Sequence, residues 1–117
     1  MNSEPRSGLE ITQLSPRFFV CGQITEDDLN AIAEQGFKSI VNNRPDNEAD
    51  GQPQSADLAA AATALDMEFV HVPVVYGSIS SQDVNDFERV CENLEGPILM
   101  FCRTGGRSAA LWKAITD

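Results

Sequence analysis

Short apolar runs alternate with longer amphipathic stretches along this chain, a pattern typical of a protein built from alternating strands and helices. The apolar runs are short and end at glycine, proline or polar residues, so each is predicted to be a strand. The predicted strands are Phe18–Cys21, Phe37–Asn42, Phe69–Val72 and Ile98–Phe101. The last of them is wholly apolar, which is typical of a strand buried on both faces of a sheet.

Helices are predicted in the intervals after these strands, from apolar positions at helical spacing. The first begins after Thr25, a good N-cap residue followed by three acids, and ends near Gly36. The others cover residues 55–65, 81–94 and 108–115.

The order of these elements predicts an α/β fold, a three-layer sandwich with a mostly parallel central sheet. In this arrangement Phe18–Cys21 is expected to pair antiparallel at one edge of the sheet. Residues 1–10 are polar and are expected to form a flexible N-terminus. Residues 11–117 are expected to form a single domain, because no linker or repeat divides them.

Composition and charge narrow the classes of function. The chain has 117 residues, of which 42% are hydrophobic, enough for one core. Its net charge of −10 argues against partners such as nucleic acid or anionic lipid, since both bind basic surfaces. No apolar run approaches the length of a membrane span, so no association with membranes is expected.

The three cysteines and one histidine bear on location and chemistry. An odd number of cysteines without a signal-peptide pattern indicates reduced thiols and a cytoplasmic location. Their scattered positions give no metal-ligand spacing, so neither a metal nor another cofactor is expected, and nothing indicates an oligomeric state. His71 lies among apolar residues in a predicted strand, which favours a structural histidine over a partner for a nucleophile. Cys21 and Cys91 are interpreted as packing residues, although either could be a resolving thiol if it lay near Cys102.

One segment near the C-terminus gathers positive charge in this acidic chain. Residues 96–117 contain Arg103, Arg107 and Lys113 but only one acid, Asp117. Within this segment a predicted strand runs into a cysteine, then a glycine-containing loop, then an arginine where a helix begins. This arrangement predicts an anion-binding loop, because backbone N–H groups and the positive end of the helix dipole converge there.

The loop residues are each expected to contact a bound anion. Gly105 and Gly106 let the backbone curl so that N–H groups, including those of Arg103 and Thr104, point inward. Arg107 can present a planar pair of donors to two oxygens of a tetrahedral oxyanion.

Cys102 is the predicted nucleophile. It follows the carboxyl end of a strand, where open α/β sheets bind ligands, and the N–H groups and arginine should lower its pKa. A thiolate beneath an oxyanion pocket is suited to attack on phosphorus or sulfur. Ser108 could donate to its sulfur or serve as a helix N-cap. The alternative is that Cys102 is a small buried hydrophobe and the glycines merely turn the chain.

Cys102–Ser108 is similar to the active-site loop shared by cysteine-dependent phosphatases and rhodanese-type sulfurtransferases. Together with segments 22–27, 42–48 and 70–74, it makes the chain resemble the phosphatase-like domain of beta-lactamase-hydrolase-like proteins. The resemblance covers about residues 11–111. It implies a cysteine-phosphatase-like fold, similar to that of the dual-specificity phosphatases, and an enzymatic cysteine.

Two features depart from ordinary phosphatases. Their loop has five residues between cysteine and arginine, whereas Cys102 and Arg107 enclose four, as in rhodaneses. Phosphatases of this fold also carry an acidic residue on a loop that corresponds to residues 73–80, and this segment holds no carboxylate. Asp46 is the best substitute acid, and Arg44 is a candidate second cation for an anionic substrate. Alternatively, these two residues belong to a solvated loop that pairs only with itself.

Three functions remain open at this point. The first is a phosphatase-like hydrolase that acts on a small phosphate ester. The second is a sulfurtransferase that takes sulfur from thiosulfate or a persulfide, which the short loop and missing acid favour. The third is a module that binds an anion without turnover.

Overall fold

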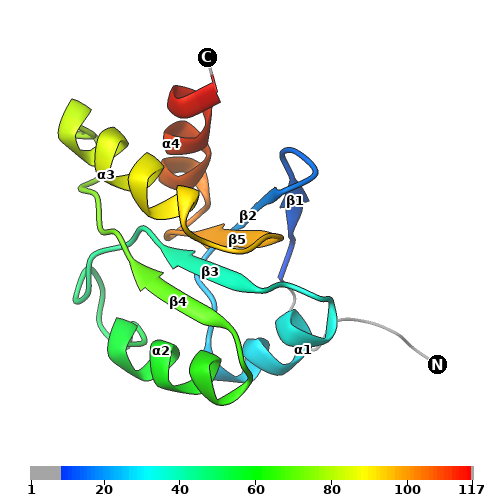
Figure 1. Cartoon of the computed structure of the whole chain (residues 1–117). Coiled ribbons are helices and arrows are strands. Elements are labelled where there is room, and N and C mark those ends of the chain that lie inside the picture. The colour runs from blue at the N-terminus through cyan, green and yellow to red at the C-terminus, as the bar shows by residue number, and fades with distance from the viewer. Residues whose placement is uncertain (1–8, 117) are drawn as a thin grey trace.

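The structure is a computed structural model that describes residues 9–116 and contains a five-stranded sheet with helices on both faces (Figure 1). The spatial order of the strands is β1-β2-β5-β3-β4. The pair β1–β2 is antiparallel, and the other pairs are parallel. The strands are β1 (Thr12–Gln13), β2 (Phe18–Cys21), β3 (Ser39–Asn42), β4 (Glu68–His71) and β5 (Ile98–Phe101). The helices are the 3-10 turn η1 (Glu26–Asp28), α1 (Leu29–Glu34), α2 (Ser55–Ala64), α3 (Ser81–Glu92) and α4 (Gly106–Thr116).

The central strand β5 is completely buried, because helices cover both faces of the sheet. Leu99 and Phe101 pack into the core formed with α1 and α2, whereas Ile98 and Met100 face the core formed with α3 and α4. In the neighbouring strand, Ile40 lies beside Leu99 in the register. A strand with two buried faces needs apolar residues at every position, which explains the sequence of β5.

These features confirm the predicted α/β class with a mostly parallel sheet. Phe18–Cys21 makes the expected antiparallel pair, with β1, but its expected position at the edge was wrong, since its other side pairs in parallel with β5. The antiparallel edge is instead β1, where Thr12 pairs with Val20, and two residues are too few to show an alternating pattern. Most of the N-terminal segment predicted to be flexible, residues 1–8, lies outside the described part of the chain.

The parallel strands carry their carboxyl ends to one edge of the sheet, and three loops meet there. They are the β5–α4 loop, the β3–α2 loop and the β4–α3 loop. Backbone bonds connect the ends of these strands, from Asn43 N to Phe101 O (2.8 Å) and from Val74 N to Asn43 O (3.0 Å). Within residues 9–116, no helix combines the length and the apolar character needed to span a membrane.

Candidate active site

The loop after β5 curls around the sulfur of Cys102. This residue is 1% exposed, and the Gly105 N–H donates to its Sγ at 3.1 Å. Gly105 has φ +96, and a Cβ there would lie 3.2 Å from the backbone oxygen of Cys21. Both the left-handed backbone and the close approach to β2 therefore require glycine at this position.

Backbone donors make Cys102 unlike the other two thiols. Burial alone would raise its pKa, but N–H groups of Ser108, Thr104, Arg107 and Gly105 outweigh that effect, and the pKa lies below its usual 9.0. The other two thiols are Cys21 and Cys91, and burial is the main cause that raises the pKa of each to about 12. Cys102 is therefore the thiol that ionises most readily.

The Ser108 hydroxyl has a different partner from the sulfur. It donates to Asn43 Oδ1 at 2.7 Å, while Asn43 Nδ2 donates to the backbone oxygen of Val72 at 3.0 Å. The Ser108 backbone N–H, rather than its hydroxyl, acts on the pKa of Cys102. These bonds hold the start of α4 against the ends of β3 and β4.

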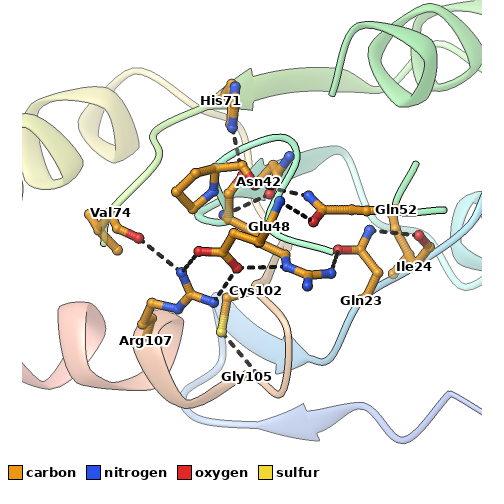
Figure 2. A network of polar contacts seen from close by, with 12 residues as sticks. Gln23, Ile24, Asn42, Glu48, Gln52, His71, Val74, Cys102, Gly105 and Arg107 are labelled. Atoms are coloured by element: carbon orange, nitrogen blue, oxygen red, sulfur yellow. Dashed lines mark hydrogen bonds and ion pairs between the residues drawn. The ribbon is translucent and has the colours of Figure 1, made fainter. Parts of the chain in front are cut away.

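Arg107, the second residue of α4, is 7% exposed and binds a carboxylate. Its Nη1 donates to Glu48 Oε2 at 2.7 Å and to the backbone oxygen of Val74 at 3.0 Å, and its Nη2 donates to Glu48 Oε1 at 2.9 Å (Figure 2). These bonds, with a smaller contribution from Arg44, lower the pKa of Glu48 to about 2. Glu48 is therefore ionised throughout the range in which enzymes usually work.

Arg44 brings a second guanidinium to the same carboxylate. Its Nε donates to Glu48 Oε1 at 2.8 Å, and its Nη1 donates to Gln23 Oε1 at 3.0 Å. His71 Nε2 lies 2.8 Å from the backbone oxygen of Arg44, so the histidine supports this loop rather than the sulfur. The β3–α2 loop thus reaches the cysteine loop, as parallel strands with a shared edge imply.

Asp46 lies on the same loop and contacts a different element. Its Oδ1 accepts a hydrogen bond from the Ser55 backbone N–H at 2.8 Å, at the start of α2. This contact satisfies one of the free N–H groups of the helix. Asp46 is not among the residues that line the cavity described next.

A cavity of about 850 Å³ opens over the cysteine loop. Its polar wall holds Arg44, Arg103 and Arg107, with Glu48 among them. Its other wall includes Tyr76, which is 81% exposed and whose ring centre lies 5.9 Å from Cζ of Arg107. A cavity with three guanidinium groups and one carboxylate suits a small anion that carries an organic group.

The structure thus brings most of the predicted residues to one place. The members around the cavity or the sulfur are Cys102, Arg103, Thr104, Gly105, Gly106, Arg107, Ser108 and Arg44. Sequence reasoning missed Glu48, whose only signal was an acid four residues after Arg44. Among residues 9–116 there is no group of three or more histidine, cysteine or acidic side chains placed to hold a metal ion.

Comparisons with known proteins bear on the family and the fold of this chain. Over residues 10–116 the chain matches the family described as beta-lactamase hydrolase-like protein, phosphatase-like domain. It is 33% identical over 104 residues to beta-lactamase hydrolase-like proteins of Agrobacterium fabrum and Xylella fastidiosa, covering 89% of this chain and 24% of each relative. The chain therefore spans about a quarter of the length of these relatives.

Solved structures of phosphatases have the same fold as this chain. A candidate phosphatase from Neisseria meningitidis superposes with a TM-score of 0.81 and 35% identity, over 87% of this chain and 72% of that one. The catalytic core of the PP-IP phosphatase Siw14 from S. cerevisiae, in complex with citrate, has a TM-score of 0.72 at 17% identity, covering 91% of this chain and 64% of its own. At that identity the likeness to Siw14 establishes the fold alone. Together the comparisons confirm the expected family and the cysteine-phosphatase-like fold.

Proposed function

The chain belongs to the family of phosphatase-like domains of beta-lactamase hydrolase-like proteins, and we propose that it is a cysteine-dependent hydrolase of small phosphate esters. One observation carries the proposal: the Cys102 sulfur lies within a ring of backbone N–H groups that lowers its pKa. Arg107 and Arg103 line the cavity above this loop, so a phosphoryl group there would meet donors on several sides.

The proposed reaction has two steps. The Cys102 thiolate attacks phosphorus, a P–S bond forms, the bond from phosphorus to the leaving oxygen breaks, and the leaving group departs with the electron pair. Water then attacks the phosphoryl–cysteine intermediate, the P–S bond breaks, and the thiolate is regenerated while water gives up one proton to solvent. The loop N–H groups and Arg107 bind the non-bridging oxygens in both steps.

The leaving group is expected to be one that departs as a stable anion. Glu48, with a pKa of about 2, holds no proton to donate, and residues 73–80 contain no carboxylate. The Asp46 carboxylate is bound to the Ser55 N–H, so a role as the general acid would require the loop to rearrange. Aryl phosphates fit the site best, because a phenolate leaves without a proton more readily than an alkoxide.

Sulfur transfer is the second candidate, and the four-residue spacing between Cys102 and Arg107 favours it. In this reaction the thiolate attacks the outer sulfur of thiosulfate, the S–S bond breaks, and sulfite leaves with the electron pair. The resulting Cys102 persulfide passes its outer sulfur to an acceptor thiolate, which restores the Cys102 thiolate. Neither step needs a general acid, which agrees with a cavity whose lining carboxylate, Glu48, has a pKa of about 2 and holds no proton to donate.

One experiment separates these functions. The purified chain is incubated with an aryl phosphate, with phosphate release measured, and in parallel anaerobically with thiosulfate, with intact mass measured. Phosphate release that is lost in Cys102→Ser supports the hydrolase, whereas a mass increase of one sulfur atom on Cys102 supports the sulfurtransferase. Anion binding with neither product would leave the third function, a binding module.

A further inference from the structure

Arg107 has five N–H donors, and the structure shows where three of them go. Both hydrogens of Nη1 are used, one by Glu48 Oε2 at 2.7 Å and one by the Val74 carbonyl at 3.0 Å. One hydrogen of Nη2 donates to Glu48 Oε1 at 2.9 Å. The Nε–H and the second hydrogen of Nη2 remain, and these two point the same way along one edge of the planar group.

The remaining edge lies on the side of the nucleophile. Hydrogen bonding to Glu48 is the largest cause that raises the pKa of Arg107, and an interaction with the Cys102 sulfur adds to it. Figure 2 shows the guanidinium between the Glu48 carboxylate and Cys102. The carboxylate thus binds one edge of Arg107, and the free edge faces the sulfur.

We propose that Glu48 is the positioning residue of Arg107: with the Val74 carbonyl, it fixes the guanidinium so that Nε–H and Nη2–H form a two-pronged donor for the oxyanion at Cys102. This inference rests on the proposed function, in which that oxyanion is the reacting group. It applies equally to a phosphate ester and to thiosulfate, since both present tetrahedral oxyanions.

Arg44 and bonds within the β3–α2 loop fix the position of Glu48 in turn. Arg44 donates to the same Oε1 at 2.8 Å and is only 5% exposed, and Gln23 holds the far end of Arg44. The Glu48 N–H donates to Gln52 Oε1, and Gln52 Nε2 donates to the Pro45 carbonyl, both bonds within the loop. A carboxylate held at both backbone and side chain is suited to orient a partner rather than to move during turnover.

Glu48→Gln tests the proposal, because an amide has one oxygen acceptor and its NH₂ cannot accept the second Arg107 bond. The variant is expected to bind inorganic phosphate more weakly by calorimetry, and to lose about tenfold to a hundredfold in kcat/KM for aryl phosphate or thiosulfate. The rate of Cys102 alkylation should stay near the wild-type value, because backbone N–H groups set its pKa. Asp50→Asn, the same change from carboxylate to amide two residues further along the loop, is the matched control.

A competing interpretation predicts the opposite change in phosphate affinity. If Glu48 merely blocked the site, removal of its charge would tighten phosphate binding, so equal or tighter binding in Glu48→Gln overturns the proposal. In a chain that already carries Arg107→Lys, Glu48→Gln should lower kcat/KM little further, because the guanidinium that Glu48 orients is gone. A further loss as large as that in the wild-type background would also overturn the proposal. If the wild-type chain is inactive and binds neither phosphate nor thiosulfate, both the proposed function and this inference are contradicted. An active wild type with an equally active Glu48→Gln contradicts this inference alone.

Discussion

Alkylation of the thiols at pH 7 should strongly favour Cys102 over Cys21 and Cys91. The pKa of the latter two is about 12, while that of Cys102 lies below 9.0. At least three pKa units separate them, so the thiolate fraction of Cys102 is larger by about 1,000-fold or more. A thiolate of lower pKa is less nucleophilic, with a Brønsted slope of about 0.4–0.5, which removes roughly 16- to 32-fold. The net preference is therefore on the order of 30- to 60-fold at the least.

The assay is brief treatment of the native chain with iodoacetamide, followed by peptide mapping of all three cysteines. A pH series should show that Cys102 labelling extends to lower pH than the labelling of Cys21 and Cys91, and a Cys102→Ser chain should lose the fast phase. Inorganic phosphate should protect Cys102, because the anion would cover the sulfur. If the reduced, anion-free chain labels Cys102 no faster than Cys21 and Cys91, the argument from backbone donors is refuted, and both proposed reactions fail with it.

Three further predictions concern the residues around the site. Gly105→Ala should abolish turnover and slow Cys102 alkylation, because the added Cβ meets the Cys21 carbonyl at 3.2 Å in a left-handed backbone; kinetics equal to wild type would contradict the loop geometry. Asp46→Ala should lower the free energy of unfolding by about 0.5–2 kcal/mol through loss of the bond to the Ser55 N–H, measured by urea denaturation; an undiminished stability would show that this bond contributes nothing. Glu48 has a lowered folded-state pKa, so its contribution to stability is present above pH 4.5 and is lost as pH falls toward about 2, and Glu48→Gln should flatten the pH dependence of unfolding in that window. An identical pH profile in the two chains would count against the Arg107–Glu48 ion pair.

The features that the sequence predicted best are formed by residues that follow one another in the chain. Ile98–Phe101 and the loop that follows need only the local pattern, and the strand, cysteine, glycines and arginine all lie within one segment. The approach of Arg44 also followed from sequence, because the carboxyl ends of parallel strands meet at one edge.

What sequence could not supply were contacts between separate loops. Glu48 binds Arg107, which lies 59 residues further along the chain, and only the folded loop decides that Glu48 rather than Asp46 points to the site. The sequence left open whether the Ser108 hydroxyl bonds to the sulfur, and its bond to Asn43 is a contact with another loop that the local pattern does not encode. β1 was missed because a two-residue strand takes its conformation from its neighbour β2 and has too few positions for a pattern.

The position of β5 sets an order of events during synthesis. It is the last strand in the sequence, yet it lies between β2 and β3 and pairs with both (Figure 1). Until the ribosome has released Ile98–Phe101, β2 and β3 have no partner on their facing edges, and the two halves of the sheet cannot join. The nascent chain therefore exposes two unpaired strand edges until β5 has been made, the kind of surface that chaperones bind. Because Cys102 follows β5 directly, the proposed nucleophile enters the fold in the same step that closes the sheet.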